Sequence, residues 1–129
     1  MLESTATTRS VRVHVVPQYL PEQSEPASGL WVHAYTVTIT NLGDAPVQLV
    51  NRHWVITNGK GQVEHVRGPG VVGNQPVLQP GQSYQYTSGC PLDTNFGTMH
   101  GSYEMSTPDG ERFEVEVAPF TLAEPYAMN

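Results

Sequence analysis

Three glycines at positions 68, 70 and 73 follow the spacing G-x-G-x-x-G, inside the stretch VRGPGVVGNQP (66–76). In a dinucleotide-binding fold this spacing lets backbone amides surround a pyrophosphate, and a helix begins after the third glycine. Here the chain continues as NQPVLQPGQ, and Pro76 and Pro80 are incompatible with a helix at that place. The sequence therefore excludes a Rossmann fold despite its glycine string.

Two interpretations of the glycine string remain open. Successive amides of a glycine-rich turn can form a concave nest for an anion without a helix, and nearby arginines could pair with a phosphate. Alternatively, the glycines only supply the positive φ angles of a loop between two sheets. The candidate anion-binding residues are Arg52, Arg67, Gly68, Gly70, Val71, Val72 and Gly73.

Other residue types that could do chemistry form no recognisable constellation. The histidines at positions 14, 33, 53, 65 and 100 show no H-x-H or H-x₃-H spacing, whereas zinc needs three or four ligands. Cys90 precedes a proline and has no helix N-terminus to lower its pKa, so a Cys–His nucleophile would need a chance meeting in space. We therefore expect no metal site, no cofactor and no enzymatic activity.

A phosphoanhydride-cleaving enzyme is a further alternative, and it would need a metal or a general base beside the glycine string. Glu64 and His65 are the nearest candidates in the sequence, and neither has an identifiable partner there.

Bulk properties exclude several classes of partner. The 129 residues suit one domain, and the net charge of −6 comes with only six scattered Lys and Arg residues, which argues against nucleic-acid binding. A single cysteine cannot form an internal disulfide, which fits a reducing compartment. The N-terminus is polar and lacks the apolar region of a signal peptide. No apolar run approaches the ~20 residues of a membrane span. We therefore expect a cytoplasmic protein without membrane insertion.

The elements that must position these residues are strands. Apolar residues alternate with polar ones in SVRVHVV, LWVHAYTVTITN and RFEVEV, which is the period of a strand with one wet face. Turn signals such as NGKG (58–61) separate about seven strands, a spacing typical of a sandwich or barrel. In VQLVNRHWVIT the apolar residues are odd-numbered at first (Val47, Leu49) and then even-numbered (Trp54, Ile56). This switch predicts a β-bulge near Asn51 or Arg52 and places Trp54 in the core. We expect one domain over residues 10–122, with loose ends at 1–9 and 123–129.

The sequence also resembles the ApaG family from about Val11 to Leu122. The resemblance rests on the combination of R-x-W-x-I (52–56), GVVG (70–73), QP (75–76), PG (80–81), Y-x-SG (86–89) and GTM (97–99). It implies an immunoglobulin-like or fibronectin type III-like antiparallel β-sandwich of about seven to eight strands. One departure concerns Pro69, which stands where the family often has an acidic residue and has no amide for an anion nest.

The same resemblance implies a function. Bacterial members are linked to cobalt tolerance and magnesium efflux, and similar eukaryotic domains occur in proteins where binding another protein is the presumed role. We therefore expect a noncatalytic protein-interaction or regulatory module with an unknown protein partner. The alternative, also implied by the family, is a binder of pyrophosphate or a dinucleoside polyphosphate at the GPGVVG loop.

Overall fold

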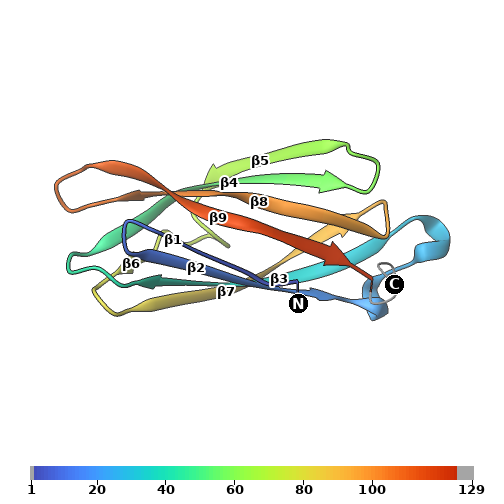
Figure 1. Ribbon diagram of the computed structural model, residues 1–129, viewed down its shortest axis with the longest axis horizontal. Helices are drawn as coiled ribbons and strands as arrows, with labels where there is room; N and C mark the ends of the chain where they lie inside the picture. The colour runs from blue at the N-terminus through green and yellow to red at the C-terminus, as the bar shows by residue number, and fades with distance from the viewer. Residues whose placement is uncertain (1, 125–129) are drawn as a thin grey trace.

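Strands account for most of the protein, and in the computed structural model, which describes residues 2–124, they form two antiparallel sheets (Figure 1). The strands are β1 (Ser4–Thr8), β2 (Val11–Tyr19), β3 (Trp31–Asn41), β4 (Val47–Asn58), β5 (Val63–Pro69), β6 (Val77–Leu78), β7 (Ser83–Leu92), β8 (Phe96–Ser106) and β9 (Arg112–Ala123). One sheet has the order β1-β2-β3-β7, and the other has the order β5-β4-β8-β9, with β6 also paired to β4. Two short 3-10 helices, η1 (Pro21–Gln23) and η2 (Pro26–Ser28), connect β2 to β3.

This architecture confirms the all-β antiparallel sandwich expected from the sequence. Residues 2–124 contain nine strands rather than seven to eight, because the sequence pattern does not indicate β1 or the two-residue β6. The glycine string is followed by β6 and not by a helix, as the prolines predict. No helix in the described part of the chain is long and apolar enough to cross a membrane.

The two ends of the chain differ from the expected loose segments. At the N-terminus the expectation for residues 1–9 is wrong, because residues 4–8 form β1, which pairs with β2 from Ser4↔Val15 to Thr8↔Val11. The second expected loose segment is 123–129. Ala123 is the last residue of β9, and the described structure continues only to residue 124. Residues 125–129 lie outside the described residues.

Trp54 lies at the centre of the core between the sheets, as the sequence predicts. Its side chain is 3% exposed, and its ring makes edge contacts with three aromatic rings at centroid distances of 5.3 Å to Tyr35, 6.0 Å to Tyr103 and 5.9 Å to Phe120. The inward valines, isoleucine and leucines of the alternating strands surround this aromatic cluster. The core therefore follows directly from the alternation of apolar and polar residues along the strands.

The parity switch in β4 is a β-bulge. Leu49 and Trp54 are both buried although an odd and an even residue of a regular strand face opposite sides. The pairing of β4 with β8 shifts between Leu49 and Asn51, so Val50 is the extra residue. The prediction of a bulge near Asn51 or Arg52 is confirmed within one residue.

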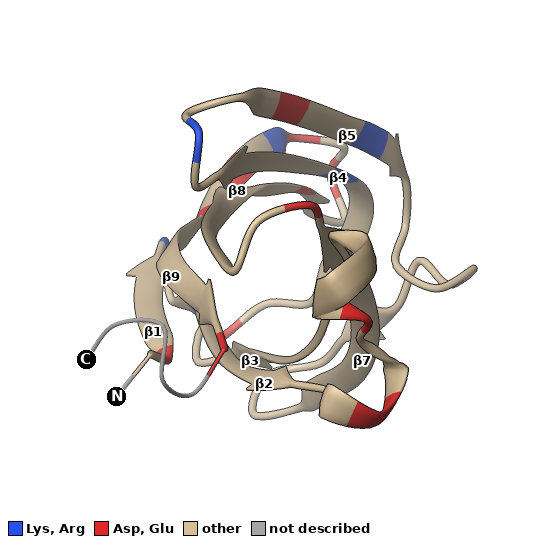
Figure 2. Ribbon diagram, turned by 90° about the vertical axis from the view of Figure 1, so that its right-hand side faces the viewer, with Lys and Arg blue, Asp and Glu red and all other residues tan. Residues whose placement is uncertain are grey.

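The sandwich is sealed along one side and open along the other. Where β1 meets β9, Ser4 Oγ donates to the Ala118 carbonyl at 2.9 Å and the Glu116 amide donates to Thr8 Oγ1 at 3.1 Å. On the opposite side, no strand pairing joins β5 to β7 among residues 2–124. Figure 2 shows this arrangement, with β1 beside β9 and β5 apart from β7.

Candidate functional site

The last glycines of the string form a tight hairpin turn rather than an open nest. Val71 and Asn74 exchange backbone hydrogen bonds of 2.8 and 2.9 Å, and between them Val72 and Gly73 both have positive φ, 40° and 84°. Positive φ at both central residues is the mark of a type I′ turn, which explains why a glycine stands at 73. Gly70 also has positive φ, and a Cβ there would overlap the Asn74 carbonyl oxygen.

The side chain of Arg52 on β4 holds this loop by hydrogen bonds. Its Nη1 donates to the carbonyl oxygens of Pro69 and Gly70, both at 3.0 Å. Gly68 leaves room for this guanidinium, since a Cβ at 68 would lie 3.0 Å from Nη1. The Gly70 amide in turn donates to the Val50 carbonyl at 2.8 Å. The amides of Gly70, Val71 and Asn74 are thus already engaged within the fold.

The two candidate arginines do not converge on the glycine string. In the register of β4 with β5, His53 lies opposite Arg67 and Arg52 lies opposite Gly68. Because side chains alternate between faces, Arg67 points to the outer face with His53, whereas Arg52 points toward the other sheet with Trp54. The seven candidate residues therefore form a braced turn, and within that turn the amides of Val72 and Gly73 have no backbone partner among residues 2–124.

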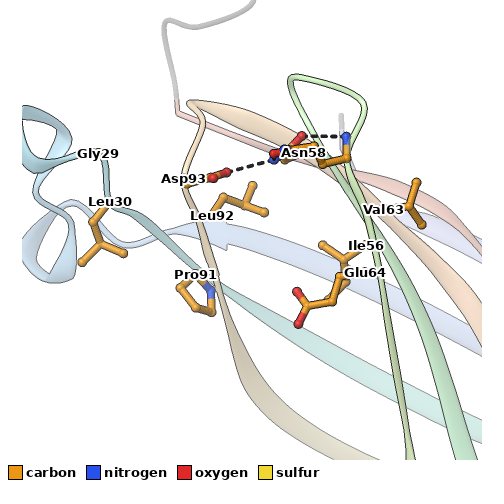
Figure 3. A pocket seen from close by; sticks show the side chains of 10 residues that line it. Gly29, Leu30, Ile56, Asn58, Val63, Glu64, Pro91, Leu92 and Asp93 are labelled. Carbon is orange, nitrogen blue, oxygen red and sulfur yellow. Dashed lines mark hydrogen bonds between the residues drawn. The ribbon is translucent and has the colours of Figure 1, made fainter.

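The open side between β5 and β7 holds a cleft of about 420 Å³. Its walls come from β4, β5, the end of β7 and the loop that contains η2 (Figure 3). Leu30, Ile56 and Pro91 supply apolar surface, and the carboxylate of Glu64 points into the space. At the rim, Asp93 accepts a hydrogen bond from Asn58 Nδ2 at 3.0 Å. The cleft therefore combines apolar walls with two carboxylates, of which Glu64 points inward and Asp93 lies at the rim (Figure 3).

A second hollow of about 270 Å³ continues the cleft inward. Ile56, Glu64 and Pro91 line both spaces, so the two hollows adjoin along the open side, and we call them together the groove. The inner part reaches the indole of Trp54 and ends at Arg52, below the glycine loop. An extended ligand lying in the groove would thus meet Asp93 in the outer hollow, Glu64 where the hollows adjoin and Arg52 in the inner hollow.

The fold also brings Cys90 and His33 together, as directly opposed residues of β7 and β3. Both are buried, and burial raises the pKa of the Cys90 thiol to about 11 while it lowers the pKa of His33 to about 4. An activated thiolate–imidazolium pair needs the opposite shifts. Neither ring nitrogen of His33 has a hydrogen-bond partner within residues 2–124.

The remaining histidines are exposed or half-buried. His14 lies 3.3 Å from Glu3, and His53 Nε2 lies 2.9 Å from His65 Nδ1. In the described structure, no group of three or more His, Cys, Asp or Glu side chains is arranged to hold a metal ion.

Sequence reasoning missed the open groove and the histidine contact. Glu64 and Ile56 face the groove only because β5 and β7 remain unpaired, which no local pattern shows. The contact between His53 and His65 had a usable signal, since the NGKG turn sets the register of β4 with β5 and places the two residues diagonally across it.

Comparisons with known proteins agree in naming one family. A family model described as the ApaG domain matches residues 21–107. Protein ApaG of Dechloromonas aromatica (strain RCB) is 53% identical over 119 residues, which cover 92% of this chain and 94% of that protein. Protein ApaG of Agrobacterium fabrum (strain C58) is 54% identical over 123 residues, 95% of each chain.

Solved structures give the same answer. The crystal structure of the putative ApaA protein from Bordetella pertussis is similar to this one with a TM-score of 0.88 and 52% identity, covering 91% of this chain and 95% of that chain. The C-terminal domain of wzt has a TM-score of 0.57 at 12% identity, covering 94% of this chain and 77% of that chain, and so shares the fold alone.

Proposed function

The chain belongs to the ApaG family, and we propose that it is a noncatalytic binding module that takes an extended segment of a partner protein into the groove between β5 and β7. The observation that carries this proposal is the open side of the sandwich. One side is sealed by side-chain hydrogen bonds between β1 and β9, whereas the other leaves an edge strand and an apolar groove next to each other.

The edge of β5 offers main-chain hydrogen bonds to an incoming strand. In the β4–β5 hairpin the Asn58 amide donates to Gln62 and the Gly70 amide donates to Val50, at 3.0 and 2.8 Å. Hydrogen-bonded pairs alternate along an antiparallel ladder, so the even residues of β5 face β4 and the odd residues face away. The main-chain groups of residues 63, 65 and 67 are therefore available for strand addition, a common mode of peptide recognition.

The groove beside that edge specifies the chemistry of the segment. An added strand would direct every second side chain inward, toward Leu30, Ile56 and Pro91, which favour apolar residues. Glu64 and Asp93 favour a basic residue next to them. We therefore expect an extended partner segment with alternating apolar residues and at least one Lys or Arg.

A noncatalytic role is supported by the shifted acid–base properties of Cys90 and His33, which leave a neutral thiol beside a neutral imidazole. The cobalt tolerance and magnesium efflux that the resemblance implies would then involve this protein as a regulator that binds another protein.

Selection of short random peptides displayed on phage against the whole protein tests this proposal. The selected peptides are expected to bind the unmodified chain and Val63→Ala with similar affinity. Val63→Pro removes only an outward-facing amide, and Glu64→Arg reverses the charge in the groove, so each should weaken binding about tenfold or more. The proposal fails if no peptide is enriched, or if enriched peptides bind Val63→Pro and Glu64→Arg as tightly as the unmodified chain.

Binding of pyrophosphate or a dinucleoside polyphosphate at the glycine loop is a second candidate. It is favoured by the exposed turn, where the amides of Val72 and Gly73 have no backbone partner within residues 2–124. Thermal unfolding with added pyrophosphate should then show stabilisation that declines as salt rises. Val72→Asp should abolish this stabilisation while Val72→Asn preserves it, because both residues tolerate positive φ and only Asp repels the anion. No stabilisation at millimolar pyrophosphate would eliminate this candidate.

A further inference from the structure

Three histidines gather on the outer face of the β5-β4-β8-β9 sheet, on the side opposite the core. Val55 of β4 pairs with His65 of β5 on one side and with His100 of β8 on the other, and His53 is two residues away along β4. Side chains two residues apart on a strand share a face, so all three imidazoles project outward together. His65 and His100 are exposed and His53 is half-buried, so this cluster is open to dissolved ions.

His53 and His65 meet through ring nitrogens. The distance from His53 Nε2 to His65 Nδ1 is 2.9 Å, while the ring centroids lie 5.2 Å apart with planes inclined by 22°. Rings in van der Waals contact face to face would lie closer than this, so the two imidazoles meet edge to edge. One nitrogen donates a proton and the other accepts it, because a neutral imidazole has one donor and one acceptor.

This contact brings two potential metal ligands to one point. If the donor ring carries its proton on its other nitrogen, both facing nitrogens present lone pairs toward the same space. Nitrogens 2.9 Å apart leave no room for an ion on the line between them, so both rings must turn about their side-chain bonds until the lone pairs converge on an ion at the Zn–N distance of about 2.0–2.1 Å. The donor ring exchanges its proton through solvent from the facing nitrogen to its other nitrogen, so each ring stays neutral overall.

Charged groups of both signs surround the pair. Burial, Arg67, His65 and His100 lower the pKa of His53, whereas Glu114 raises it. Only neutral imidazole binds a metal. Glu114 also supplies a negative charge that offsets part of the repulsion between Arg67 and a cation.

We propose that His53 and His65 form a two-imidazole site for a borderline divalent transition-metal ion, of the class of Zn²⁺, Ni²⁺ or Cu²⁺. Imidazole is a preferred ligand for these ions, whereas Mg²⁺ and Ca²⁺ prefer oxygen ligands. With two protein ligands the ion keeps open positions for water or for a donor from another molecule. The site lies on the outer face of the sheet and is independent of the groove between β5 and β7.

Titration of the whole protein with NiCl₂ or ZnCl₂, followed by NMR of the imidazole carbon-bound protons, tests the site. The signals of His53 and His65 are expected to shift or broaden first. In the unmodified chain, an ion bound to one imidazole meets the other imidazole at a high effective concentration. His53→Asn and His65→Asn each remove that second ligand and should weaken metal binding roughly a hundredfold. His14→Asn is the matched control, since it removes a half-buried histidine from the other sheet and should leave the affinity unchanged.

Two results would overturn the proposal. One is an unmodified protein that shows no site-specific change up to millimolar metal. The other is an equal affinity in His53→Asn, His65→Asn and the unmodified chain. Circular dichroism of each variant checks that the fold is intact, and we expect that it is because both side chains lie on the outer face of the sheet, away from the core.

Discussion

His33 is expected to make the protein sensitive to acid. Its side chain is 0% exposed, packs against the ring of Tyr19 at a centroid distance of 5.3 Å and lies opposite Cys90. Burial lowers its pKa to about 4, and neither nitrogen has a hydrogen-bond partner in the described part of the chain. Protonation therefore places an uncompensated charge inside the sandwich.

The size of the effect follows from the difference between folded and unfolded pKa values. An unfolded histidine has a pKa of about 6.5, and each unit of difference corresponds to about 1.4 kcal/mol. A folded pKa of about 4 therefore gives about 3 kcal/mol. As the pH falls, the unfolded chain binds the proton before the folded chain does, which favours unfolding. The about 3 kcal/mol of folding stability is therefore fully present above pH 6.5 and is lost as the pH falls to 4.

Urea unfolding of the unmodified chain and of His33→Leu, measured from about pH 7.5 to pH 4, checks this calculation. At neutral pH the variant should be as stable or more stable, because it buries no unpaired nitrogen. At pH 4 it should exceed the unmodified chain by about 3 kcal/mol more than at pH 7.5. His14→Asn, which removes a half-buried histidine outside the core, should follow the unmodified curve. Parallel curves for His33→Leu and the unmodified chain would refute the reasoning.

Three further predictions concern stability. Trp54→Ala should cost about 3–5 kcal/mol in urea unfolding, and a variant as stable as the parent would remove Trp54 from the core. Gly101→Ala should lower the free energy of unfolding by several kcal/mol, because the added Cβ would overlap the His53 carbonyl oxygen. The comparison variant Gly61→Ala has open space around the added Cβ but a positive φ, and should cost only about 1–2 kcal/mol. Arg52→Met removes the two hydrogen bonds to the loop, so amide hydrogen exchange in the hairpin turn should accelerate about tenfold or more, and unchanged rates would show that the guanidinium does not hold the loop.

Period-two alternation was enough to predict the strands with strongly apolar inward faces. It placed Trp54 in the core and showed that β4 must contain a bulge, because a strand cannot change its inward parity otherwise. The strand β1 was not predictable in this way. Its residues STATT are small and polar on both faces, and it is held by pairing with β2 and by the hydrogen bond of Ser4 to Ala118.

The candidate site was harder to predict than the fold for a physical reason. A glycine string specifies backbone angles but not which amides remain free, and here the internal hydrogen bonds of Gly70 and Val71 consume those that an anion would need. The groove depends on which two strand edges stay apart, and that is a property of the whole topology. The positions of Glu64 and Arg52 in the groove became visible only with the order of the sheets.

The indole of Trp54 lines the inner part of the groove, and this gives the molecule an intrinsic fluorescent reporter. The chain contains two tryptophans, and Trp54 alone of the two lines the inner hollow. A segment that displaces solvent from that hollow should change the emission of Trp54, while Trp31 supplies a background that Trp31→Phe removes. Occupancy of the open side can thus be followed by intrinsic fluorescence, without a label that would itself obstruct the groove.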